Sequence, residues 1–138
     1  EIAGPTIEFL GGVRDEQLTA LYRGAKATIF AALDEDFGIV PVESMAAGTP
    51  VIGLNQGGVK ETVVDGKTGV LFNEPTVESL VEAIKKFDRT YTTHAYESEC
   101  RKQADKFSKE RFVREIQAFV KEKMKTGSPH ACPQSKRR

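Results

Sequence analysis

Short apolar runs alternate with segments of helical periodicity along the first 87 residues of the chain. Between the runs, apolar side chains recur at the spacing of a helix that lies on a sheet, as at Leu18, Leu21 and Tyr22. The runs themselves are unbroken rather than alternating, which is typical of parallel strands covered on both faces. We therefore predict an α/β fold, a Rossmann-like parallel sheet flanked by helices. The expected strands cover residues 6–10, 27–33, 50–54 and 69–72.

The limits of the helices follow from residues that cap or break them. Asp15 and Thr76 stand where an N-cap is expected, and Gly48 stops the segment 39–47. Residues 89–96 look like a polar connection between two helical stretches. The expected helices cover residues 15–25, 39–47, 60–64 and 76–88, a stretch up to 106, and a last helix after Ser108.

The C-terminal part is predicted to be helical and then irregular. Phe112, Ile116 and Phe119 share one side of the last helix, at plain amphipathic spacing, and are expected to be core. Past residue 125 the sequence has no periodicity and ends in three basic residues. We expect a domain over residues 1–125 and a disordered basic tail over 126–138.

The charge balance argues against a nucleic-acid partner. The chain of 138 residues has 20 basic and 20 acidic side chains, so no field of one sign covers the surface. From Lys121 to Arg138, six basic residues stand against Glu122 alone. A weak contact with an anionic membrane surface at low salt therefore stays open as an alternative.

The cysteines and the apolar runs indicate the compartment. Cys100 and Cys132 lie far apart in dissimilar surroundings, as expected of free thiols in a reducing environment. No segment resembles a signal peptide, and no apolar run approaches the ~20 residues that cross a bilayer. We expect a cytoplasmic protein, with a peripheral contact at the inner face of the membrane as the open alternative.

The strongest candidate for chemistry is the loop after the second expected strand. Ligands of open parallel sheets gather at the carboxyl ends of the strands, where loops lead into helices. Here Glu35 and Glu43 stand eight positions apart across a loop-to-helix junction. Gly38 lets a ligand approach the backbone, and the first amides of the helix can donate to a diphosphate. This pattern predicts an anion site without a basic side chain.

The string EDFGIVPVESMAAGTPVI, residues 35–52, resembles the Glu-x7-Glu signature of the group 1 (GT4) glycosyltransferases. The similarity extends to FLGGV at 9–13, GGVKE at 57–61 and DGKTGVLF at 65–72, and covers roughly residues 6–120. A pair of glutamates alone would carry little weight, whereas the string and its neighbours together are specific. The resemblance implies a retaining glycosyltransferase of the GT-B fold, of which this chain is the C-terminal, donor-binding domain.

The resemblance also implies roles for individual residues. Glu35, the expected catalytic residue, would hydrogen-bond hydroxyls of the transferred sugar, and Glu43 would hold the ribose diol. The donor would be a nucleotide-diphosphate sugar, with a hexose such as mannose or glucose transferred to a glycan or lipid acceptor. The segment that would seat the base is Val13, Arg14 and Asp15; the residues that would surround the sugar and diphosphate are Asp36, Phe37, Gly38, Ile39, Val40, Gly57 and Gly58.

Parts of the family pattern are absent from this sequence. The N-terminal domain that holds the acceptor has no counterpart, and neither does the basic pair that clamps the diphosphate. The chain also begins close to its first strand, so we expect a fragment or an excised domain that turns over little by itself.

Other interpretations of the same residues remain. Glu35 could be a solvated loop carboxylate, and Glu43 could be stabilised by the helix dipole without a ligand. The triplet of residues 34–36 is an Asp-x-Asp, the metal-binding signature of the other large glycosyltransferase fold, but the helix that follows already favours phosphate, so we expect no metal and no cofactor. A non-catalytic nucleotide-binding or interaction module with the same fold is the main alternative function. A phosphorylase would need a lysine-bound pyridoxal site, for which no motif is present.

Overall fold

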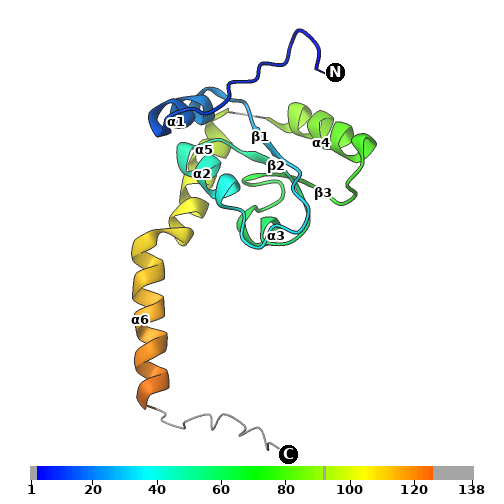
Figure 1. The fold of residues 1–138 in the computed structure, drawn as a ribbon. Coiled ribbons are helices and arrows are strands. Elements are labelled where there is room, and N and C mark those ends of the chain that lie inside the picture. The colour runs from blue at the N-terminus through cyan, green and yellow to red at the C-terminus, as the bar shows by residue number, and fades with distance from the viewer. Residues whose placement is uncertain (1–2, 92, 126–138) are drawn as a thin grey trace, which may run out of the picture. The chain divides into compact units, whose positions relative to one another are not determined.

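The structure is a computed structural model that describes residues 3–91 and 93–125, and the predicted tail over 126–138 lies outside them. The chain divides into two compact units, residues 1–106 and 107–138. The first unit contains a parallel sheet between α4 on one side and α1, α2 and α5 on the other (Figure 1).

The sheet has three strands, in the order β1-β2-β3. They are β1 (Thr28–Phe30), β2 (Val51–Leu54) and β3 (Gly69–Phe72), and both pairs are parallel. Every residue of the central strand β2 is buried, as the unbroken apolar run predicts. The predicted parallel α/β architecture is confirmed.

Most of the predicted helices are present. Those of the first unit are α1 (Asp15–Gly24), α2 (Ile39–Ala47), α3 (Val59–Thr62), α4 (Val77–Thr90) and α5 (Thr93–Ala104), followed by a short 3-10 helix (Asp105–Phe107). The Thr76 hydroxyl accepts a hydrogen bond from the Ser79 amide, and Gly48 ends α2 with a φ of 96°. At α1 the cap is Arg14 rather than Asp15, because the Gln17 side chain accepts from the Arg14 amide at 3.1 Å. No helix in the described part of the chain is long and apolar enough to cross a membrane.

The predicted polar connection over residues 89–96 is wrong. Helix α4 continues to Thr90, and α5 begins at Thr93. Phe87 packs against Tyr91 and Tyr96, with ring centroids 5.0 and 5.7 Å apart. The segment looked polar because tyrosine carries a hydroxyl, yet its ring contributes a large apolar face to a core.

The predicted first strand, residues 6–10, does not form either. Ile7 and Phe9 are 55% and 82% exposed, and the segment is irregular. A strand is stable only where a neighbouring strand takes its backbone hydrogen bonds, and none does so among the described residues. An apolar run alone therefore did not decide the strand.

The last helix, α6 (Lys109–Lys125), forms as predicted, and its apolar stripe is not buried within its own unit. Phe112, Ile116 and Phe119 are 66%, 43% and 54% exposed, and no residue of the helix is buried. Helical periodicity shows which face of a helix is apolar and leaves open what that face meets.

Cys100 is a buried member of the core, and its thiol should be inert in the folded protein. Burial, with the charge of Glu99 adding to it, raises the pKa of the thiol to about 12. In a Cys132→Ser variant we expect thiol reagents at pH 8 to label the chain in urea but not in buffer. Because the unfolded chain releases this proton first, the neutral thiol stabilises the fold below the ordinary pKa of 9.0, and this contribution is lost as pH rises toward 12. Fast labelling of the folded variant would contradict the burial of Cys100.

Candidate functional site

The loop after β1 meets α2 at Gly38, and Glu35 occupies part of that junction. Gly38 is the N-cap residue, with a left-handed φ of 79°. Its amide donates to Oε1 of Glu35 at 3.1 Å, and Glu35 is partly buried. The predicted catalytic carboxylate thus caps the helix, and the amide that the sequence interpretation assigned to a diphosphate binds Glu35 instead.

Two further amides stand at the start of α2. The first amides of a helix have no acceptor within the helix. Here they belong to Ile39 and Val40, because Pro41 has no N–H and the Val42 amide donates to the Gly38 carbonyl at 3.4 Å. Ile39 and Val40 are 59% and 38% exposed. The start of α2 therefore lies at the surface, where the N-terminus of a helix favours an anion.

The loop after β2 lies directly against the loop after β1. The Gly58 amide donates to the Glu35 carbonyl at 2.8 Å. A Cβ at Gly57 would stand 2.1 Å from the Glu35 carbonyl oxygen, and one at Gly58 would stand 2.4 Å from Cα of Phe37. Only glycine permits this approach, so Gly57 and Gly58 support the backbone that carries Glu35.

The acidic triplet does not assemble into a metal cluster. Asp34 has a left-handed φ of 55°, and both Asp34 and Asp36 are exposed. Over residues 3–91 and 93–125, no three His, Cys, Asp or Glu side chains come together in a way that could hold a metal ion.

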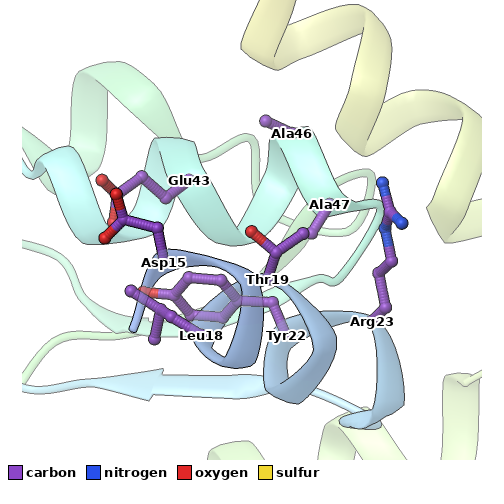
Figure 2. A pocket seen from close by; sticks show the side chains of 8 residues that line it. All are labelled: Asp15, Leu18, Thr19, Tyr22, Arg23, Glu43, Ala46 and Ala47. Atoms are coloured by element: carbon purple, nitrogen blue, oxygen red, sulfur yellow. The ribbon is translucent and has the colours of Figure 1, made fainter. Parts of the chain in front are cut away.

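A pocket of about 430 Å³ lies between α1 and α2 (Figure 2). It brings together Asp15, from the segment predicted to seat the base, and Glu43, predicted to hold the ribose. Val13 does not join them, since it lines a separate apolar hollow with Leu10 and Leu21. The pocket is lined by Asp15, Leu18, Thr19, Tyr22, Arg23, Glu43, Ala46 and Ala47.

Tyr22 is a site residue that sequence reasoning missed. It belongs to the predicted apolar stripe of α1, yet it lines the pocket beside Glu43. Burial, then the charge of Glu43, raise the pKa of Tyr22 above its ordinary value. A tyrosine in a half-buried apolar stripe could have indicated a site residue, because its hydroxyl needs a hydrogen-bond partner there.

Helix α2, which carries Glu43, is held at its C-terminal end by α5. The Arg101 guanidinium donates to the carbonyls of Ala46 and Ala47, at 3.3 and 3.1 Å, and to Glu97 at 3.0 Å. A cation at this end also offsets the negative pole of the helix. The buried Ser44 hydroxyl donates to the Thr49 carbonyl at 3.0 Å. These bonds make α2 a fixed support for the pocket.

Comparison with known proteins gives a family for this arrangement. The family model described as glycosyl transferases group 1 matches residues 3–111. The alpha-1,3/1,6-mannosyltransferase ALG2 of Dictyostelium discoideum is 39% identical over 115 residues, 82% of this chain and 27% of that protein. The D-inositol 3-phosphate glycosyltransferase of Corynebacterium kroppenstedtii is 39% identical over 67 residues, 49% of this chain and 15% of that protein.

A solved structure shares the fold. The sucrose-phosphate synthase of Thermosynechococcus elongatus matches with a TM-score of 0.76 and 25% identity, over 87% of this chain and 31% of that chain. The chain thus spans less than a third of the length of these relatives.

Proposed function

Because the chain belongs to the group 1 glycosyltransferase family, we propose that α2 and its flanking loops form the donor site of a hexosyltransferase that uses a nucleotide-diphosphate sugar. The family and the GT-B fold expected from the sequence are confirmed. The name of the Dictyostelium relative supports mannose as the transferred sugar, and a glycan or lipid is the proposed acceptor.

The pocket between α1 and α2 carries this proposal. It has a volume typical of small-molecule sites and combines apolar walls with a few polar groups. Glu43 lies four residues after Ile39, so both share one face of α2. A nucleoside in the pocket would therefore have its ribose at Glu43 and its diphosphate near the amides of Ile39 and Val40.

The chemical task at this site would be to stabilise the leaving nucleoside diphosphate. Negative charge grows on the β-phosphate as the bond to the sugar breaks. Donors already aligned toward that charge lower the barrier, and a single one contributes about 3 to 4 kcal/mol. The amides of Ile39 and Val40 and the positive pole of α2 would act in this way. We assign no metal and no cofactor to this step.

Glu35 would orient the sugar rather than attack it. Its Oε1 accepts from the Gly38 amide, which holds the carboxylate above the start of α2. A carboxylate has further lone pairs, so Glu35 can accept from sugar hydroxyls while this bond persists. We propose attack on the face from which the phosphate leaves, without a covalent intermediate on Glu35.

Replacing Glu43 should weaken donor binding. Hydrogen bonds to a charged group contribute about 1.5 to 3 kcal/mol, so Glu43→Gln should raise the Kd by about 10- to 100-fold. Calorimetric titration of the chain with GDP-mannose and UDP-glucose measures this change. Glu78→Gln, which removes the same charge from the first turn of α4, is the matched control and should leave the Kd unchanged.

The phenol of Tyr22 gives a second readout of the Glu43→Gln substitution. Loss of the Glu43 charge should lower the pKa of Tyr22, which ultraviolet absorbance follows. Donor binding that is saturable and equally tight in Glu43→Gln would contradict the ribose assignment. If neither donor binds the wild-type chain, the proposed donor site is wrong.

Transfer itself should need the acceptor domain as a partner. The chain covers less than a third of its relatives, so we propose that the acceptor lies mainly on the remaining part of the longer protein. Donor binding without transfer in a two-domain version would favour the non-catalytic nucleotide-binding module.

A further inference from the structure

We propose that Thr49 is a positioning residue of the donor site: its hydroxyl holds α1 at the distance from α2 that a nucleotide needs. This role rests on the proposed function, because it concerns the two walls of the pocket in which a nucleoside diphosphate would bind. Thr49 does not line that pocket. It acts through the two helices that do, and it is not a catalytic residue.

The pocket has one wall on each of two helices (Figure 2). Helix α1 supplies Asp15 and Tyr22, among others, and α2 supplies Glu43. No residue of α1 is buried, so apolar packing holds this helix only weakly against its neighbours. The width of the pocket therefore depends on the polar contacts that fix α1 relative to α2.

Thr49 makes such a contact from the turn between α2 and β2. Its hydroxyl donates to the backbone carbonyl of Tyr22, in the last turn of α1, at 2.5 Å. Thr49 is only 3% exposed, so water competes little for this hydrogen bond. The bond joins the end of α1 to the turn that follows α2.

Thr49 is itself fixed to α2 through its backbone. Its amide donates to the Ser44 carbonyl at 2.9 Å, and its carbonyl accepts from the Ser44 hydroxyl at 3.0 Å. Ser44 is fully buried, and its hydroxyl also lies 2.8 Å from the hydroxyl of Thr28 on β1. Because Ser44 donates its proton to Thr49, Thr28 is the donor in that second bond. Thr49 is thus tied to α2 and the sheet, and its own hydroxyl holds α1 to both.

This arrangement matters only to a ligand that contacts both walls. A nucleoside diphosphate would place its nucleoside between Asp15 and Glu43 and its diphosphate at the start of α2, whereas pyrophosphate would contact α2 alone. If α1 is free to shift, only a fraction of the molecules has a pocket of the correct width. The apparent Kd of a ligand that needs both walls then rises by the inverse of that fraction. The Kd of a ligand held by α2 alone does not change.

The test therefore compares nucleotides with pyrophosphate by calorimetry. Thr49→Val removes the hydroxyl and keeps the branched shape of the side chain. We expect it to raise the Kd for GDP and UDP about fivefold, the effect of one hydrogen bond, and to leave the Kd for pyrophosphate unchanged. Thr49→Ser keeps the hydroxyl and should bind all three ligands as wild type does.

Thr68→Val is the matched control. Thr68 is 2% exposed, stands just before β3, and accepts from the Val64 amide through its hydroxyl at 2.8 Å. The control should lower the urea midpoint without changing the Kd of any of these ligands. If Thr49→Val does not fold, Ser44→Ala replaces it, because it removes the bond to the Thr49 carbonyl and the link to Thr28. It should raise the Kd for GDP and UDP but not the Kd for pyrophosphate.

Three results would overturn the positioning role while nucleotide binding stands. They are an unchanged Kd for GDP in Thr49→Val, an equal rise for GDP and pyrophosphate, and a loss in Thr49→Ser as large as in Thr49→Val. If pyrophosphate does not bind the wild type, α2 alone does not hold the diphosphate and the positioning role fails as well. If no nucleotide binds at all, the proposed function fails with it.

Discussion

Gly58→Ala should destabilise the chain by about 3 kcal/mol, near the upper end of what overpacking costs. The added Cβ would stand 2.4 Å from Cα and 2.5 Å from the carbonyl carbon of Phe37. These are backbone atoms, so no flexible side chain can move aside. The loops after β1 and β2 would have to separate, and the hydrogen bond from the Gly58 amide to Glu35 would be lost. Urea unfolding followed by circular dichroism measures the change.

Gly12→Ala is the matched control for this substitution. Nothing lies within 4 Å of a Cβ at Gly12, and its backbone is not left-handed. Its stability should stay within about 0.5 kcal/mol of wild type. We also expect Gly58→Ala, and not Gly12→Ala, to weaken donor binding, because the displaced loop carries Glu35. Equal stabilities of the two variants would show that the loops do not approach as closely as described.

Phe87→Ala should cost about 3 to 5 kcal/mol, because it removes the central ring of the aromatic group. Phe87 is 3% exposed and contacts the rings of Tyr91 and Tyr96. The cavity would lie where α4 and α5 meet, and two packed tyrosines cannot easily collapse into it. Urea unfolding gives the loss in stability, and near-ultraviolet circular dichroism reports whether the tyrosines lose their fixed surroundings.

Phe9→Ala is the matched control for Phe87→Ala, because it makes the same chemical change at an exposed position, where stability should not change. Phe9 is 82% exposed in the segment that was predicted to be a strand. We expect a change within about 0.5 kcal/mol. A large loss there would mean that residues 6–10 pack against the fold after all, and a small loss at Phe87 would mean that α5 is not an integral part of the core.

The position of α5 links this core to the donor site. Arg101 on α5 bonds the last carbonyls of α2, while Cys100 beside it is buried in the core. Helix α2 is thus fixed at its C-terminal end by α5 and at its start by the Glu35 loop. A site on a helix secured at both ends keeps its amides and Glu43 in one arrangement before a ligand arrives.

The sequence by itself determined the local elements and the family. The unbroken apolar runs indicated the buried strands β2 and β3, and Thr76 and Gly48 set helix ends because caps act within a few residues. The string over residues 35–52 was specific enough for the family. Each of these features depends on residues that are close together in the sequence, so it can be read from the sequence alone.

Only the tertiary structure decided which groups meet. The Gly58 amide binds the Glu35 carbonyl, and one pocket is lined by Asp15, Tyr22 and Glu43. It also decided that residues 6–10 pair with no described strand. Periodicity gives the apolar face of an element but not its partner. The element against which a segment packs depends on how parts of the chain about 20 or more residues apart come together. Local sequence rules do not contain that information.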